Sequence, residues 1–469
     1  MRRAIAFAQC ELSSIRRLPI MPSADKSKRM ITVRFAPSPT GYLHIGNART
    51  ALVNYLTAKK QGGRFILRLD DTDVERSRPE YAEALFEDVA WLGISWDETF
   101  RQTERLARYD AALAELKARG AIYPAYETPD ELDKKRKRQQ ARGLPPVYDR
   151  AALKLTEADR ATLDAEGRKP HWRFKLTGKT VAWADGVRGD AHIETSSLSD
   201  PVLVREDGTV LYTFASVIDD IDSNVTDVIR GEDHVANTAV QIELFAALGA
   251  TPPRFAHHNL IASATGEEMS KRKGSLSIRS FRELGAEAMG VASVAVLTGT
   301  AEATRIVPDL ESLAELFELG KMSRALTKFD PAEIMTLSAR WLHDASYAAV
   351  SDRLAALGLH QCEPLWLAVR ANVTKLADVL EWHRVATAAI VTVIEEPDYI
   401  ALAIQHMPSD AFTDISWGQW TEALKAATGR KGKALFMPLR QGLTGLDHGP
   451  DMKAFLPLIG RERALERLR

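Results

Sequence analysis

The stretch from Ile31 to Asp73 constrains the fold of this chain more than any other, because it predicts a strand, a tight loop, a helix and a second strand. Ile31, Val33 and Phe35 alternate with polar or small residues, which is the period of a strand, and this leaves Arg34 facing away from the apolar side. Prolines and a glycine then break the strand, and a helix follows that stops at a glycine pair. The order predicts a parallel sheet, whose ligands bind at the carboxyl ends of the strands.

The turn between the first strand and the helix carries the sequence His44-Ile45-Gly46-Asn47. A helix N-terminus offers free backbone N–H groups and a partial positive charge, which suit a phosphate group. Gly46 lets a ligand approach the backbone closely, and His44 can donate a hydrogen bond to a phosphoryl oxygen. Taken alone, this pattern is typical of an ordinary capped turn. A second motif, Glu268 to Gly274, places Lys271 in a strongly basic loop.

Five separate motifs together resemble those of one enzyme family. His44-Ile45-Gly46-Asn47 and Met269-Ser270-Lys271-Arg272 resemble the HIGH and KMSKS signatures of class I aminoacyl-tRNA synthetases. The segments 34–41, 71–73 and 226–233 resemble the glutamyl/glutaminyl subgroup. Because the motifs agree in order and spacing from about residue 30 to the C-terminus, the chain is similar to the bacterial-type glutamyl-tRNA synthetases.

This resemblance implies an α/β fold with a Rossmann-like, doubly wound parallel catalytic domain. It also implies an inserted α+β module that binds the acceptor stem and an all-α C-terminal region that binds the anticodon. The length of 469 residues suits two to four domains. The expected boundaries are an N-terminal extension at 1–29, the two halves of the catalytic domain at 30–120 and 212–274, the insert at 121–211, a helical stem-contact region at 275–340 and the anticodon-binding region at 341–469.

Local patterns predict the elements within these regions. After Ser275 the strand signal disappears, and helices are predicted, including one over Leu365–Val379 and a last recognisable one over Lys433–Leu443. Strands are predicted at His171–Leu176, Thr180–Ala184, Pro201–Arg205, Leu211–Ser216, Asp227–Gly231 and Phe255–Ile261.

The segment 1–29 is rich in arginine and precedes the family pattern. It is either the product of an upstream start codon, with Met21 or Met30 as the true start, or a bacterial extension, or a mitochondrial-type targeting segment. In each case we expect poor order.

Composition narrows the kinds of site and partner. A net charge of −1 gives no global attraction to nucleic acid, so RNA binding must come from local basic patches. The chain has only Cys10 and Cys362, which excludes a disulfide framework and a cysteine-rich zinc site; some family members carry a zinc-binding insert, and no zinc or other protein-bound metal is expected here. His257 and His258 lack an evident third ligand, so they are interpreted as structural or tRNA-related. No apolar run of membrane length occurs, and we expect a cytoplasmic monomer.

The reaction that the resemblance implies is attack of a carboxylate on the α-phosphate of ATP, followed by transfer to a terminal ribose hydroxyl of tRNA. Neither step needs a protein nucleophile, so the protein must position the reactants and neutralise charge. The predicted catalytic residues are His44, Gly46 and Lys271, and Mg²⁺ arrives with ATP. The predicted ATP-binding residues are His44, Ile45, Gly46, Asn47, Asp233, Ile261, Ser270, Lys271 and Arg272.

The amino-acid pocket needs an anion for the ammonium group and cations for the side-chain carboxylate of glutamate. Asp70 supplies the anion, and Arg34 and Arg230 supply the cations; the alternative is a strand-end ion-pair cluster. Asp70 stands where the family usually has glutamate, and Glu268 stands where the signature begins with lysine. The predicted glutamate-binding residues are Arg34, Ala36, Ser38, Asp70, Tyr212 and Arg230.

The basic run from Lys134 to Arg138 is either a solvated helix face or a contact for the tRNA acceptor end. The predicted tRNA contacts are Lys134, Lys135, Arg136 and, in the helical tail, Arg440, with tRNA-Glu as the partner and tRNA-Gln as a second candidate. Three rival functions are a glutaminyl-tRNA synthetase, a short paralogue that glutamylates a modified base of tRNA-Asp, and a non-catalytic tRNA-binding homologue. The retained His44, Gly46 and Lys271 and the long helical tail disfavour them.

Overall fold

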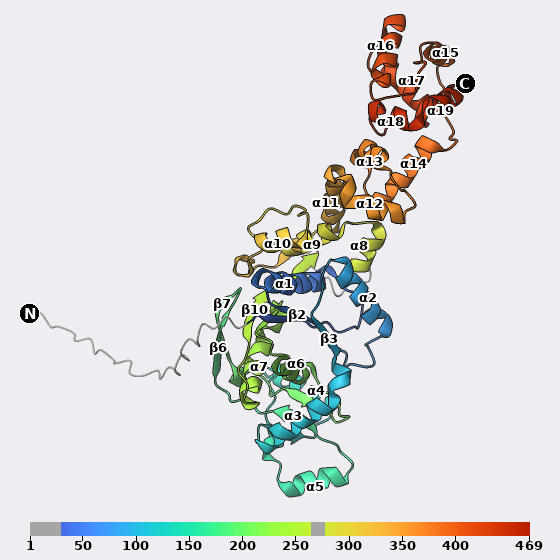
Figure 1. The fold of residues 1–469 in the computed structure, drawn as a ribbon. Coiled ribbons are helices and arrows are strands. Elements are labelled where there is room, and N and C mark those ends of the chain that lie inside the picture. Colours follow the sequence, from blue (N-terminus) through green and yellow to red (C-terminus); the bar gives the residue numbers. More distant parts are fainter. Residues whose placement is uncertain (1–29, 264–276) are drawn as a thin grey trace, which may run out of the picture. The chain divides into compact units, whose positions relative to one another are not determined.

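A computed structural model describes residues 30–263 and 277–469 (Figure 1). By internal contacts the chain divides into Met1–Met30 and Ile31–Arg469, and all the described helices and strands lie in the second unit. The predicted extension 1–29 and the loop residues Glu268, Ser270, Lys271 and Arg272 lie outside the described residues.

The predicted strand–helix–strand unit is confirmed as β1 (Thr32–Phe35), α1 (Ile45–Gln61) and β2 (Arg64–Leu69). β1 and β2 pair in parallel, with Thr32 opposite Arg64. Gly62 ends α1 in the left-handed conformation, with φ of 62°, a backbone geometry that favours glycine.

The parallel pairing continues on both sides of this unit. β3 pairs with β2, and β9 pairs with β10. The two groups of strands meet where the backbone N–H of Thr226, just before β9, donates to the carbonyl of Thr32 at 2.9 Å. The hairpin of β6 and β7, predicted as part of the inserted module, instead joins β10 through Asp185 opposite Phe255. The bounds are β3 Glu98–Arg101, β6 Thr180–Asp185, β7 Gly189–Glu194, β9 Asp227–Gly231 and β10 Arg254–His258.

Helices cover both faces of these strands, as the doubly wound prediction requires (Figure 1). Val33 and Phe35 of β1 share a core with α1, α9 (Ala288–Leu297) and α10 (Leu310–Leu316), whereas α6 (Tyr212–Asp222) and α7 (Val235–Ala247) cover the other face. The strand predicted at Leu211–Ser216 is therefore wrong. Phe214, Val217 and Ile218 are buried at helical spacing, which outweighs their β propensity.

A separate antiparallel sheet of β4, β5 and β8 lies in the predicted insert. Thr128 caps α4 by accepting a hydrogen bond from the backbone of Glu131 at 3.3 Å. The elements preceding and within this region are α2 Pro79–Trp91, α3 Leu106–Ala118, β4 Ile122–Ala125, α4 Pro129–Ala141, α5 Glu157–Ala165, β5 His171–Phe174 and β8 Val202–Val204.

The rest of the chain is almost entirely helical, as predicted, with three differences. A short strand β12 (Thr327–Phe329) pairs in parallel with β11 (Ile261–Ser263). The helix predicted over Leu365–Val379 instead ends with α13 at Val369, and two short 3-10 turns follow before α14 begins at Val379. Two further helices follow the last predicted one. None of the described helices is long and apolar enough to cross a membrane. The helices are α8 Ile278–Leu284, α11 Pro331–Asp344, α12 Tyr347–Ala356, α13 Glu363–Val369, α14 Val379–Thr387, α15 Pro397–Gln405, α16 Ser416–Thr428, α17 Lys433–Thr444, α18 Met452–Ile459 and α19 Arg461–Leu468.

Candidate active site

One face of the parallel strands carries polar side chains beneath α6 and α7. The period of two directs Arg34, Arg68 and Arg230 to this face, opposite the apolar residues that pack on α1. The prediction that Arg34 faces away from the apolar side is therefore right, but α6 covers that side as well, and Arg34 is only 4% exposed. The site is a buried polar layer between strands and helices.

Asp70 and Arg34 belong to a single buried ion-pair network. Arg68 donates to Asp70 through Nε at 2.6 Å and through Nη2 at 3.1 Å, and its Nη1 donates to Asp220 at 2.9 Å. Arg34 Nε donates to the same Asp220 at 3.2 Å. Burial raises the pKa of Asp70 to about 6, against the opposing effect of Arg68. Asp70 and Arg34 therefore both make the ion pairs expected of a strand-end cluster, which was the alternative to an amino-acid pocket.

Sequence reasoning missed Arg68, Asp219 and Asp220 in this network. Arg68 stands two residues before Asp70, so the strand period already placed both on one face. Asp219 and Asp220 are adjacent carboxylates directly after the apolar residues Val217 and Ile218, which was an available signal because buried carboxylates need partners.

Arg230 is buried among polar side chains with which it makes hydrogen bonds. It donates to the Tyr212 hydroxyl at 3.1 Å, to Thr238 Oγ1 at 2.7 Å and to His257 Nε2 at 3.2 Å. In the part of the chain that the structure describes, Arg230 makes no ion pair with a carboxylate, and burial lowers its pKa, with Arg34 adding to the effect. Asp220 and Tyr212 offset this lowering only in part, so an anion entering this layer would give Arg230 a direct ion-pair partner.

The loop after β1 lies beside Asp70. The backbone N–H of Asp70 donates to the carbonyl of Pro37 at 3.0 Å, which brings the neighbouring Ala36 and Ser38 to the same strand end. Ala36 is half-buried and Ser38 is exposed, so Ser38 can contact a ligand from the solvent side.

His44 caps the first turn of α1. The ring Nδ1 of His44 accepts a hydrogen bond from the backbone N–H of Gly46 at 3.1 Å. The backbone N–H of His44 donates to Asn47 Oδ1 at 3.1 Å. Burial lowers the pKa of His44, so the neutral ring carries its proton on Nε2 and can donate it to a phosphoryl oxygen. A Cβ at Gly46 would lie 3.0 Å from the His44 ring, so a larger residue here would displace the ring. Ile45, between them, is buried in the core.

The remaining predicted ATP residues occupy separate places. Asp233 is exposed in the turn that follows β9, and its Oδ1 lies over Gly231, where an added Cβ would come within 2.5 Å. Ile261 is buried in β11, so only its backbone can meet a ligand. Ser270, Lys271 and Arg272 lie outside the described residues.

The His257–His258 pair is tied to protein groups. His257 Nδ1 lies 2.5 Å from Asp185 Oδ2, and His258 Nε2 lies 3.0 Å from Thr50 Oγ1. Within residues 30–263 and 277–469, no group of three or more His, Cys, Asp or Glu side chains could hold a metal ion.

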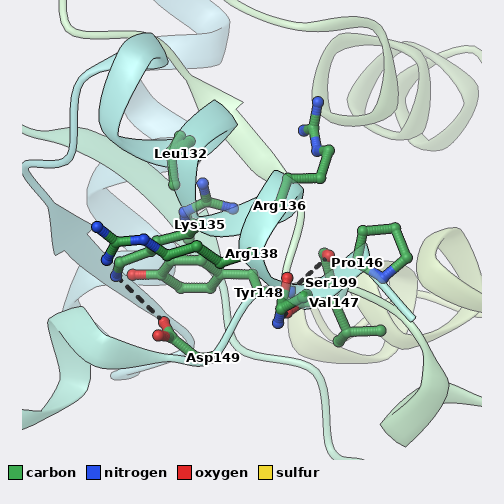
Figure 2. A pocket seen from close by; sticks show the side chains of 11 residues that line it. Leu132, Lys135, Arg136, Arg138, Pro146, Val147, Tyr148, Asp149 and Ser199 are labelled. Atoms are coloured by element: carbon green, nitrogen blue, oxygen red, sulfur yellow. Dashed lines mark hydrogen bonds and ion pairs between the residues drawn. The ribbon is translucent and has the colours of Figure 1, made fainter. Parts of the chain in front are cut away.

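Two of the predicted tRNA residues on α4, Lys135 and Arg136, border a pocket of about 230 Å³ (Figure 2). Lys135 lies 3.2 Å from Glu127 and 3.4 Å from Asp149, so its charge is already compensated. Arg136 lines the pocket, is exposed, and makes no ion pair among the described side chains; Lys134 is also exposed. The Arg173 guanidinium stacks 3.9 Å from the centre of the Tyr148 ring in the same pocket.

Arg440 lies on α17 and is half-buried. Its Nη2 donates to the carbonyl of Pro450 at 2.9 Å, whereas Nη1 is buried without a partner among the described residues. Burial lowers the pKa of Arg440.

Two family models match this chain. Residues 30–336 match the model described as tRNA synthetases class I (E and Q), catalytic domain, and residues 394–469 match the model of an anticodon binding domain. The chain belongs to the class I tRNA synthetases. Among its relatives, Glutamate–tRNA ligase 2 of Methylorubrum populi is 60% identical over 438 residues, covering 93% of this chain and 98% of that protein. Glutamate–tRNA ligase 2 of Methylobacterium sp. is 60% identical over 439 residues, covering 93% and 98%.

Solved structures agree with this assignment. The crystal structure of a glutamate tRNA ligase from Elizabethkingia meningosepticum, in complex with its amino acid, superposes with a TM-score of 0.80 at 28% identity, covering 94% of this chain and 98% of the other. Glutamate-tRNA synthetase from Elizabethkingia anophelis gives a TM-score of 0.79 at 28% identity, covering 94% and 99%. The fold predicted from the sequence is thus that of this synthetase.

Proposed function

We propose that this chain is a glutamate–tRNA ligase. It activates L-glutamate with ATP, forming glutamyl-adenylate and releasing pyrophosphate, and then transfers the glutamyl group to the 3′-terminal adenosine of tRNA-Glu. The match over 30–336 and the relatives at 60% identity support this activity. The anticodon-binding model over 394–469 supports tRNA as the partner. tRNA-Gln is a second candidate substrate.

The observation that carries the choice of glutamate is Arg230. A guanidinium that is 4% exposed and forms no ion pair with a carboxylate in the described chain favours an anionic ligand over a neutral one. The side-chain carboxylate of glutamate has the required charge, and the Tyr212 hydroxyl is at hand for the same group. Asp70, ionised above pH 6, is the group for the ammonium, with Ala36 and Ser38 at the same strand end.

The ATP site lies at the N-terminus of α1. His44 donates from Nε2 to a phosphoryl oxygen, Gly46 leaves room for its ring, and Asn47 holds the capped turn. Asp233 and the backbone at Ile261 flank the nucleotide. Lys271, with Ser270 and Arg272, neutralises the charge that develops on the phosphates. Mg²⁺ enters as part of the ATP substrate, and no zinc is required.

The tRNA acceptor end contacts Lys134, Lys135 and Arg136, and the anticodon region contacts Arg440. The domains follow the expected boundaries except that the β6–β7 hairpin pairs with β10 of the catalytic strands. The rest of 121–211 and the region 275–340 lie on the acceptor side, and 341–469 lies on the anticodon side. The enzyme acts as a cytoplasmic monomer.

ATP–pyrophosphate exchange, measured with glutamate or glutamine and with or without tRNA, tests the proposal. Glutamate-dependent exchange that needs tRNA is expected, because members of this family typically need tRNA for activation. Replacing Arg230 with alanine should remove about 3–5 kcal/mol of preference, which is a hundredfold to a few thousandfold change in discrimination. The measured quantity is kcat/KM for charging with each labelled amino acid.

Two outcomes would overturn parts of this assignment. Exchange with glutamine alone would make the chain a glutaminyl enzyme, and no exchange with either amino acid would make it a non-catalytic homologue. Equal loss of both amino acids in Arg230→Ala would leave the activity assigned but remove Arg230 from the pocket.

A further inference from the structure

A buried chain of three side chains runs from the β6–β7 hairpin to the proposed amino-acid pocket. Asp185 ends β6, His257 lies on β10, and Arg230 lies on β9 between β10 and β1. His257 Nδ1 lies 2.5 Å from Asp185 Oδ2, and Arg230 Nε lies 3.2 Å from His257 Nε2. The side chains of Asp185 and His257 are fully buried, with exposed fractions of 0%.

These contacts require one form of the His257 ring. A carboxylate can only accept, so Nδ1 carries the proton that faces Asp185. A guanidinium can only donate, so Nε2 must present its lone pair to Arg230. The ring is therefore neutral with the proton on Nδ1, and Thr238 Oγ1, 3.0 Å from Nε2 and 2.7 Å from Arg230 Nη2, fits the same arrangement.

Asp185 is itself held in place by backbone groups. Its Oδ1 accepts the N–H groups of Val187 at 3.1 Å, Arg188 at 3.0 Å and His257 at 3.1 Å. This leaves Oδ2 for the imidazole and for the Trp183 indole at 3.3 Å. The carboxylate therefore has a fixed orientation, and it sets which nitrogen of His257 is protonated.

We propose that Asp185 and His257 are positioning residues that orient the Arg230 guanidinium and thereby set the preference for glutamate over glutamine. The proposal rests on the function proposed for Arg230. The His257 ring accepts a hydrogen bond from Nε of Arg230, and Tyr212 and Thr238 accept from the other two nitrogens. Together these contacts fix the plane of the guanidinium. A fixed plane is what bidentate recognition of a carboxylate needs.

The sharpest variant is Asp185→Asn. Three backbone N–H groups hold the amide oxygen at the position of Oδ1, so the NH₂ group must face His257 Nδ1. The ring must then carry its proton on Nε2, pointing at the N–H of Arg230. Shape and size barely change, but the acceptor that orients Arg230 is lost.

Two substitutions of His257 separate its two contacts. The side-chain amide of glutamine reaches about as far as Nε2, so His257→Gln keeps an acceptor for Arg230. Asparagine reaches only as far as Nδ1, so His257→Asn keeps the contact with Asp185 and loses Arg230. Glu243→Gln is the matched control, because Glu243 also is a buried carboxylate that ties this hairpin to α7, through Thr177 and Thr195, without touching His257.

The experiment measures kcat and KM for glutamate and for glutamine in tRNA charging, with the KM for ATP and the melting temperature measured alongside. For Asp185→Asn and His257→Asn we expect the glutamate-to-glutamine ratio of kcat/KM to fall by at least about tenfold, because one hydrogen bond to a charged group is lost. The fall should come from a higher KM for glutamate. His257→Gln should retain most of the ratio, and Glu243→Gln should keep it while lowering the melting temperature.

The outcomes separate this inference from the proposed function. If Arg230→Ala collapses the ratio and Asp185→Asn leaves it unchanged, the positioning role is wrong and the function of Arg230 stands. If Arg230→Ala itself leaves the ratio unchanged, the pocket assignment fails instead. If His257→Gln and His257→Asn lose the ratio equally, the acceptor at Nε2 is not what matters, and the proposal is overturned.

Discussion

Gly46 shows how a single residue can be required by its neighbour and not by its own backbone angles. A Cβ at this position would lie 3.0 Å from Cε1 and Nδ1 of His44, closer than nearly all real contacts of this kind. The backbone itself accepts alanine, and alanine favours a helix over glycine by about 1 kcal/mol. The steric cost of alanine at position 46 therefore comes from the position of the His44 ring.

Gly46→Ala should consequently lower kcat for ATP–pyrophosphate exchange by at least about tenfold. The added methyl group displaces the His44 ring, whose Nε2–H stabilises the charge that develops on the phosphates. The melting temperature should change little. Gly418→Ala is the matched control, since Gly418 also lies in the first turn of a helix and has open space where a Cβ would go. A variant with full exchange activity would contradict the role of His44 in this site.

Asp70 gives a prediction with a defined pH. Burial raises its pKa to about 6, so above pH 6 it is the anion that an ammonium group needs, and below pH 6 it becomes neutral. The KM for glutamate should therefore rise about tenfold for each pH unit below 6. Asp70→Asn should raise KM at pH 8 and remove this dependence.

Asp88 supplies the control for this experiment. Burial raises its pKa to about 6 as well, but it lies on α2 and faces Arg282 at 3.8 Å, away from the polar layer. Asp88→Asn should leave the pH dependence of KM for glutamate as it is in the unaltered protein. An unchanged dependence in Asp70→Asn would assign the ionisation to another group.

Among the elements, those with a strong period were predictable from the sequence and those defined by distant partners were not. The unit of β1, α1 and β2 follows from alternation and helical spacing alone. α6 was predicted as a strand because Leu211, Tyr212 and Phe214 favour strands, yet its burial follows the helical period. The β6–β7 hairpin was assigned to the wrong neighbours, because its pairing with β10 joins residues about seventy positions apart.

The same division applies to the site. Arg34 and Arg230 lie in the family motifs and were predicted as pocket residues with Asp70 and Tyr212. The partners of Arg34 and Arg230 were not predicted, because they come from other elements. Arg68 needed only the strand period. Asp185, by contrast, meets Arg230 through His257 across three strands, and no local pattern in the sequence reports such a contact.

Helix α4 carries a prediction about tRNA, because a net charge of −1 leaves binding to local patches. Arg136 is exposed beside the pocket and makes no ion pair among the described residues, whereas Lys135 is paired with Asp149 (Figure 2) and also with Glu127. Arg136→Ala should therefore weaken tRNA binding and lower the slope of log affinity against log salt by about 0.7–0.9.

Lys135→Ala should change the slope less, because its charge is already compensated within the protein. Lys137, which pairs with Asp133 at 2.7 Å and does not line the pocket, is the control on the same helix. Filter binding of tRNA across a range of salt concentrations gives these slopes. Equal slopes in all three variants would favour the interpretation of this run as a solvated face.

The pH dependence of stability is a property of the whole molecule, because buried groups in several elements contribute with opposite signs. Burial lowers the pKa of five histidines, so they resist protonation in the folded state while the unfolded chain takes up protons below its ordinary value of 6.5. Their contribution is present above 6.5 and is lost as pH falls. Asp70 and Asp88 act in the opposite direction, since a raised pKa stabilises the fold as pH falls through 6.

His258 is the group in which this effect can be isolated. Burial lowers its pKa to about 4, with Arg49 adding to the effect, so between pH 6.5 and 4 the fold should lose roughly 3 kcal/mol of stability through this residue alone. His258→Asn cannot take up the proton, yet its amide can still donate where Nδ1 donates to the carbonyl of Asn259 at 3.0 Å. Asparagine lacks the Nε2 that lies 3.0 Å from Thr50 Oγ1, so the variant should be less stable than the unaltered protein at pH 7.5. The difference in stability should shrink steadily as pH falls to 4.5, because only the unaltered protein loses the contribution of the histidine. Denaturant unfolding at four pH values measures both free energies, and a gap that stays constant would show that His258 titrates alike in the folded and unfolded chains.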